Sequence, residues 1–151
     1  MITSSQVSNV NPGQRIAFSV IDYMGTSHTG TRQYIETTSN LQILSFSPRI
    51  SRVKAIELAT HTPKVGEPII MLGYQFGVQN ALTLGLVSSY RDDLGRIYST
   101  IPTDSLGQGA AWLNTMHQLV GIQIATENNQ SIGLSLEALN LFLLRYDEGG
   151  A

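Results

Sequence analysis

The stretch VGEPIIMLGYQFGVQNALTLGLVSSY, residues 65–90, decides the fold of this chain. Its apolar residues recur mostly at every second position, first over residues 68–73 and again over residues 81–89. A short segment that contains Gly77 and Asn80 separates the two runs. Alternation of this kind is typical of strands with one face against a core, and the break between the runs predicts a turn. The stretch therefore predicts two strands of an antiparallel sheet.

The same alternation extends over most of the chain and predicts an antiparallel all-β domain. Gly, Pro, Asn, Asp and Ser separate about nine short apolar runs. The predicted strands cover residues 14–23, 31–36, 41–46, 68–73, 81–89, 96–101, 110–114, 118–126 and 131–134. Turns are predicted at residues 25–30, 37–40, 114–118 and 127–130.

One helix is predicted, and it closes the domain at residues 135–145. Ser135 is expected to cap its first turn, because a serine hydroxyl can accept a free backbone N–H there. Leu136, Leu139, Leu143 and Leu144 are expected to share the buried face. The six residues that follow, YDEGGA, have the composition of a frayed tail.

Length and composition limit the classes of protein that the chain can represent. With 151 residues, 42% hydrophobic and 13% charged, it has enough apolar material for one packed domain. The net charge of −2 argues against nucleic acid as a partner. No apolar run predicts a membrane-spanning segment, and the first residues do not resemble a signal peptide. No cysteine is present, which excludes disulfides and thiolate sites, and the compartment stays open.

General motifs for catalysis, nucleotides or metals are absent from the sequence, so no cofactor is predicted. The histidines, His28, His61 and His117, lie far apart and are expected in loops or on the surface. A metal site built from them in space stays an open alternative. Asp92 and Asp93 are expected in a hairpin turn and Trp112 in the core. Arg49, Arg52, Lys54 and Lys64 are expected on a solvated face.

The stretch at residues 65–90 resembles the start of the second barrel in trypsin-like serine proteases of the HtrA/Deg family. The matching residues, in order and without a gap, are Val65, Gly66, Glu67, Gly73, Phe76, Gly77, Thr83, Gly85, Val87 and Ser88. Residues 103–105, 119–122 and 133–135 are similar to later family segments. The resemblance implies a trypsin-like double β-barrel, with residues 1–47 as a remnant of the first barrel and 48–64 as a connection. It assigns residues 65–134 to the second barrel and 135–146 to the C-terminal helix.

At each catalytic position that the resemblance identifies, this sequence departs from the family. MITSSQV, residues 1–7, is similar to the segment of the general-base histidine and places Gln6 there. SNLQIL, residues 39–44, is similar to the segment of the orienting aspartate and places Asn40 there. LGQGA, residues 106–110, stands in the nucleophile segment and places Gln108 at the serine. A second alignment places Gly109 there instead, and neither residue has a hydroxyl.

The resemblance therefore implies a pseudo-protease. Acyl transfer needs a nucleophile, a base and a group that orients the base, and neutral amides supply none of these. Leu106 stands where a family glycine donates its N–H to the oxyanion, and the segment from Asp104 to Gln108 is about four residues shorter than the family's. The amides Gln6, Asn40 and Gln108 are expected to satisfy one another as a hydrogen-bonded plug.

Several functions follow from this interpretation. The leading one is a non-catalytic scaffold or regulatory subunit that binds a protein partner within a larger assembly. The incomplete first barrel would offer an open sheet edge for such a partner. The main alternative is a peptide- or ligand-binding domain that adds an extended peptide to residues 118–126 in the former substrate cleft. An active peptidase that uses Thr103 or Ser105 is the least favoured alternative, and an unrelated β domain also stays open.

Overall fold

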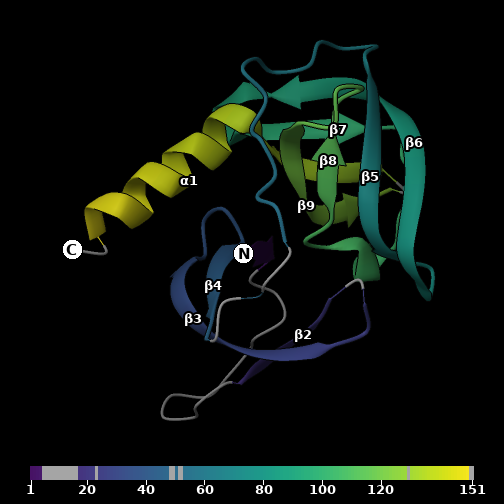
Figure 1. Ribbon diagram of the computed structural model, residues 1–151. Coiled ribbons are helices and arrows are strands. Elements are labelled where there is room, and N and C mark those ends of the chain that lie inside the picture. The colour runs from purple at the N-terminus through teal and green to yellow at the C-terminus, as the bar shows by residue number, and fades with distance from the viewer. Residues whose placement is uncertain (5–16, 23, 48–49, 51–52, 129, 150–151) are drawn as a thin grey trace. The chain divides into compact units, whose positions relative to one another are not determined.

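Strands dominate both parts of the chain in the computed structural model (Figure 1). The structure describes residues 1–4, 17–22, 24–47, 50, 53–128 and 130–149. Two compact units make up the chain, Met1–Ala55 and Ile56–Ala151. Gln6, Arg49 and Arg52 lie outside the described residues.

The first unit holds a four-stranded antiparallel sheet in the order β1-β4-β3-β2. Its strands are β1 (Ile2–Ser4), β2 (Phe18–Ile21), β3 (Ser27–Glu36) and β4 (Leu41–Phe46). Phe18, Leu41, Ile43 and Leu44 supply its buried apolar side chains. This sheet does not close on itself among the described residues, and the prediction of an incomplete first barrel is confirmed.

The second unit contains a closed barrel of six strands in the order β10-β7-β6-β5-β8-β9, seen in teal and green in Figure 1. Every neighbouring pair is antiparallel. The strands are β5 (Pro68–Gln75), β6 (Val78–Arg91), β7 (Arg96–Ser99), β8 (Ala111–Leu113), β9 (Leu119–Glu127) and β10 (Gln130–Ser135). Apolar side chains that alternate along these strands meet inside the barrel, Trp112 among them, as predicted.

Gly133 and Gly121 allow neighbouring strands to pack closely around Trp112, which is fully buried. A Cβ atom on Gly133 would lie 2.9 Å from the indole ring, and one on Gly121 would lie 2.8 Å from the carbonyl oxygen of Leu134. Both distances are below normal van der Waals contact. The two positions therefore require glycine because of close packing rather than because of an unusual backbone conformation.

The helix α1 (Leu136–Gly149) lies against β9 and β10. The hydroxyl of Ser135 accepts the backbone N–H of Ala138 at 3.3 Å, which confirms the predicted cap. The predicted buried face is wrong in part, because Phe142 is buried while Leu144 is 56% exposed. At 3.6 residues per turn, Leu139 lies at the centre of the buried stripe and Leu144 more than a third of a turn away from it. No helix in the described part of the chain is long and apolar enough to cross a membrane.

The start of β3 differs from the prediction of a turn at residues 25–30. The strand begins at Ser27, and Gly30 lies inside it, paired with Phe18 and packed under the ring of Phe46. The polar run Ser27–Thr29 concealed this half of the strand, because only one of its residues is half-buried. The short strand β1 was also not predicted, since its three residues are fewer than the pattern needs.

The hairpin that joins β5 to β6 turns on Phe76 and Gly77, which both have positive φ, at 48° and 80°. Two-residue hairpins of this kind favour Asn-Gly, because asparagine and glycine tolerate the left-handed region. Phe76 is 62% exposed, so little packing compensates for its backbone conformation. A bulky aromatic residue at this position is a strained choice.

We expect Phe76→Asn to stabilise the second unit by about 1 kcal/mol, because asparagine adopts positive φ at lower cost. Urea unfolding followed by the fluorescence of Trp112, the single tryptophan of the chain, measures the effect. Phe76→Leu is the matched control, since it also removes the ring but keeps the unfavourable φ. Equal stability changes in the two variants would contradict the role assigned to the backbone.

Candidate functional site

The candidate nucleophile segment is a short loop of the second unit that leads into β8. It contains the 3-10 helix η3 (Ser105–Gly107), whose N-cap is Asp104. Gln108 follows with an extended backbone, at φ −64° and ψ 133°, and is half-buried. Gly109 then has a φ of +88°, which a residue with a side chain rarely adopts. The chain thus reverses directly after Gln108.

Asp104 holds this loop through both of its carboxylate oxygens. The Oδ1 atom accepts the backbone N–H of Leu106 at 3.1 Å, and the Oδ2 atom accepts that of Phe76 at 3.0 Å. Its carbonyl oxygen accepts the N–H of Gly107 at 3.2 Å and the hydroxyl of Thr126 at 3.3 Å. One residue therefore ties the loop to the β5–β6 hairpin and to β9.

This arrangement occupies the donor that the resemblance assigns to an oxyanion hole. Catalysis of acyl transfer needs backbone N–H groups aimed at the oxygen that becomes negative. The N–H of Leu106 is instead donated to the carboxylate of Asp104, and that of Gly107 to the carbonyl of the same residue. The two N–H groups stabilise the loop itself.

Strand β9 holds the other end of the loop through Gln123. The backbone N–H of Gly109 donates to the carbonyl of Gln123 at 2.8 Å, and the N–H of Gln123 donates to Ala110 at 2.9 Å. The side chain of Gln123 is fully buried and accepts the indole N–H of Trp112 at 3.2 Å. The barrel core therefore positions the segment that carries Gln108.

The same side chain bears on the peptide-binding alternative. One edge of β9 pairs with β8 from Leu119 to Ile122, and the other edge pairs with β10 from Gly121 to Glu127. A peptide added beside β9 would need backbone groups after Ile122, and the Nε2 atom of Gln123 already donates to the carbonyl of Ala125 at 2.7 Å. An internal hydrogen bond thus competes with peptide binding at this strand.

Thr103 and Ser105 are the two hydroxyl residues of the loop. Thr103 is buried, and its hydroxyl donates to the carbonyl of Asp104 at 3.2 Å. Ser105 is exposed at the start of η3. No histidine or carboxylate side chain among the described residues forms a hydrogen bond to either hydroxyl. A nucleophile of this kind needs an adjacent base, and the described residues place none in hydrogen-bond contact with either hydroxyl.

Asn40 belongs to the first unit, where it ends the turn before β4. Its φ is 55°, and its backbone N–H donates to the carbonyl of Thr37 at 3.3 Å. Asparagine tolerates this conformation, so the turn alone gives a structural reason for the residue. Strand β1 pairs Ser4 with Leu41, the residue after Asn40. Gln108 lies in the other unit, so the predicted cluster of three amides stays a prediction.

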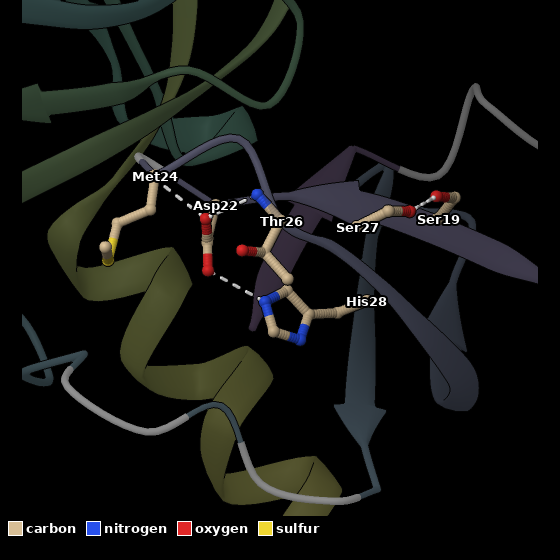
Figure 2. A network of polar contacts seen from close by, with 6 residues as sticks. All are labelled: Ser19, Asp22, Met24, Thr26, Ser27 and His28. Atoms are coloured by element: carbon tan, nitrogen blue, oxygen red, sulfur yellow. Dashed lines mark hydrogen bonds and ion pairs between the residues drawn. The ribbon is translucent and has the colours of Figure 1, made fainter.

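A polar network in the first unit contains a histidine that the sequence reasoning underrated (Figure 2). The Nε2 atom of His28 lies 2.9 Å from the Oδ2 atom of Asp22, and their side chains are 21% and 14% exposed. The Oδ1 atom of Asp22 accepts the N–H groups of Met24 and Thr26, both at 2.9 Å. His28 is thus a partly buried strand residue with an ionic partner. These hydrogen bonds, that of His28 first, lower the pKa of Asp22.

The other sequence-predicted residues occupy exposed positions. His61 and His117 are exposed, as expected, and so are Lys54 and Lys64. The backbone of η2 (Asp92–Leu94) forms the predicted turn between β6 and β7. Asp93 pairs with Arg91 at 3.3 Å, and that hydrogen bond lowers the pKa of its carboxyl. The described residues contain no group of three or more His, Asp or Glu side chains that could hold a metal ion.

With this geometry established, comparison with known proteins identifies the family. The model of the trypsin-like peptidase domain matches residues 1–122, which is most of the chain. The chain belongs to the trypsin-like peptidase domain family. No curated protein matches it.

Solved structures confirm the trypsin-like fold of this peptidase-family chain. A serine endoprotease from Yersinia pestis superposes with a TM-score of 0.84 at 15% identity, over 99% of this chain and 54% of that one. The HtrA-type protease AlgW, solved with a decapeptide, gives 0.84 at 17% identity over 99% and 48%. An inactive mutant form of Rv3671c from M. tuberculosis gives 0.80 at 13% identity over 97% and 76%. The chain spans about half the length of the first two proteins.

Two residues of this trypsin-like domain that organise its loop were missed by the sequence reasoning. Gln123 stands in an apolar strand, where a buried polar residue signals an internal hydrogen-bonding role. Asp104 precedes a short polar segment, and aspartate is a favoured N-cap residue. Neither signal identifies the partner atoms, because these lie far away in the sequence.

We expect Asp104→Ala to lower the free energy of unfolding of the second unit by about 2 kcal/mol, since it removes the acceptor of two backbone N–H groups. Urea unfolding followed by Trp112 fluorescence measures this loss. Asp104→Asn is the matched variant and should lose less, because it keeps one acceptor oxygen. An alanine variant as stable as the parent would show that the two hydrogen bonds contribute nothing.

The network around Asp22 predicts a local transition at acid pH. A carboxyl whose folded pKa is lowered stabilises the fold above its unfolded pKa of about 4, and this stabilisation is lost as the pH falls through the folded value. The amide NMR signals of Met24 and Thr26 should therefore shift with a midpoint below about 4. In His28→Gln the midpoint should rise, and in Asp22→Asn the transition should vanish. A parent midpoint at or above the usual value would contradict the lowered pKa.

Proposed function

We propose that this trypsin-like domain is a non-catalytic peptidase homologue that acts as a protein-binding scaffold or regulatory subunit of a larger assembly. The observation that carries the proposal is the loop around Gln108. Its N–H groups at Leu106 and Gly107 are donated to Asp104, so they are not presented to a substrate oxygen. In the trypsin-like template the donors are the N–H groups at the positions of Leu106 and Gln108, so one of these two donors is taken by Asp104, which weighs against acyl transfer.

The residues at the catalytic positions support the same conclusion. We propose that Gln6, Asn40 and Gln108 are vestigial triad positions, with Gly109 as the alternative to Gln108. Amide side chains accept no proton near neutral pH and do not attack a carbonyl group. Loss of a complete triad lowers kcat by on the order of a million-fold. Residual hydrolysis at that level would have no practical use.

The domain organisation forms part of the proposal. We propose that residues 1–151 form one trypsin-like domain, with a first-barrel remnant at residues 1–47 and a connection at 48–64. Residues 65–134 would be the second barrel, followed by the C-terminal helix, which was predicted to end at residue 146 and extends to Gly149 in the structure. The open sheet in the first unit supports a role in assembly, because unpaired strand edges are templates for pairing with another chain.

Peptide binding by the former substrate strand is the second candidate. It is favoured by the similarity to AlgW, whose structure was solved with a decapeptide. It is opposed by the hydrogen bond from the Gln123 side chain to the carbonyl of Ala125. We therefore rank it below the scaffold function.

The purified chain should not hydrolyse fluorogenic peptides above the buffer rate, and it should not react with a fluorophosphonate probe. Gln108→Ser alone should stay inactive, because a serine without a base is a weak nucleophile. Ser105→Ala and Thr103→Ala test the two hydroxyls of the loop, and Ser89→Ala is the matched control at an exposed strand position. Hydrolysis that vanishes only in the Ser105 or Thr103 variant would overturn the non-catalytic proposal.

A further inference from the structure

The outer face of the β5–β6 hairpin is a ladder of apolar side chains, all exposed except the half-buried Ile70. Three cross-strand pairs form it, Pro68 with Leu86, Ile70 with Leu84, and Leu72 with Leu82. We name these six residues the leucine face. Leu72, Leu82, Leu84 and Leu86 are 44%, 62%, 66% and 46% exposed. Ile69 and Met71, the alternate residues of β5, point the other way and are fully buried in the barrel.

The leucine face is also free of charge. No Asp, Glu, Lys, Arg or His occurs between Pro68 and Tyr90, and the nearest charged residues are Glu67 and Arg91 at the ends of this stretch. Single exposed leucines are common on protein surfaces, but a contiguous patch with no charged residue is typical of an interaction site. Solubility would favour charged side chains on an outward-facing strand pair.

We propose that the leucine face binds a second copy of this chain in a symmetric dimer. A symmetric dimer uses the same patch on both copies, and a patch without charges brings no like charges together at the twofold axis. Flat pairs of strands pack against each other in this way in β-sandwiches. A charged partner would find no complementary group on the six residues.

The size of the leucine face agrees with a weak dimer. If a fully exposed side chain of this kind presents about 150 Å², the six residues offer roughly 400 Å² per copy. Tyr74, which is 42% exposed, extends the surface toward the hairpin tip. Two copies would then bury roughly 1,000 Å², the lower limit for a specific interface. The expected dissociation constant lies in the micromolar range.

This proposal is independent of the catalytic status of the domain. None of the six residues belongs to the loop around Gln108 or to the hydrogen bonds of Asp104. A dimer would be compatible with an active or an inactive peptidase. Peptide hydrolysis and self-association are separate measurements, so either proposal can fail while the other stands.

Sedimentation velocity of the full chain over about 1 µM to about 1 mM tests the dimer, since this range brackets the expected constant. The parent should shift from monomer to dimer, and Leu84→Glu should weaken the association more than tenfold by placing like charges at the interface. Leu144→Glu is the matched control, because Leu144 is 56% exposed on α1 and lies outside the leucine face. It should dimerise like the parent.

A charge-swap experiment separates a lost interface from a damaged fold. Leu84→Lys alone should also be monomeric, and an equimolar mixture of the Leu84→Glu and Leu84→Lys chains should associate again. A parent that stays monomeric at about 1 mM overturns the proposal, as does a Leu84→Glu variant that dimerises normally. Binding of a monomeric parent to phosphatidylcholine vesicles, lost in Leu84→Glu, would also overturn it and identify a lipid surface as the occupant.

Discussion

The packing of Trp112 between two glycines is the constraint on which the second unit depends. The barrel closes around this fully buried ring because Gly133 and Gly121 have no side chain that would meet the ring or the neighbouring strand. The indole N–H is satisfied by the Oε1 atom of Gln123, as a buried donor requires. The backbone of Gln123 in turn pairs with Gly109 and Ala110. One aromatic side chain therefore determines both the barrel and the position of the candidate loop.

Within that frame, the loop satisfies its own hydrogen-bonding groups. An oxyanion hole keeps donors unpaired until substrate arrives, which costs stability, and active sites commonly store strain of this kind. Here Asp104 accepts the donors of Leu106 and Phe76, and Gly107 donates to its carbonyl. The hydrogen bonds that stabilise the loop make the N–H groups of Leu106 and Gly107 unavailable to a ligand. These donors are therefore paired within the loop and its neighbouring hairpin.

Much of the fold could be predicted from local patterns, and the exceptions have identifiable physical causes. Strand β4 has the predicted bounds because four consecutive buried residues mark it, and Ser135 caps α1 because the signal is local. The first half of β3 escaped prediction because Ser27, His28 and Thr29 are all polar and give no alternating apolar pattern. Leu144 was misplaced and Phe142 overlooked because leucine-rich helices carry more apolar residues than one face can bury.

The candidate site was less predictable than the fold, because it depends on partners that are distant in sequence. The resemblance located the loop at residues 106–110, but no local pattern shows that Asp104 reaches Phe76, which is 28 residues away. The link between Trp112 and Gln123 likewise follows from the pairing of β8 with β9 rather than from either strand alone. A family pattern shows which residue type stands at each aligned position. Only the structure shows which atoms accept the backbone N–H groups of the loop.

The loop and the leucine face differ in whether their groups already have partners within the chain. In the loop the backbone donors of Leu106 and Gly107 are already paired, so a ligand there would have to break existing hydrogen bonds before it formed new ones. On the leucine face the apolar side chains are exposed, so covering them releases water and breaks no internal contact. Binding on the leucine face therefore breaks no internal hydrogen bond, whereas binding at the backbone donors of Leu106 and Gly107 would break two.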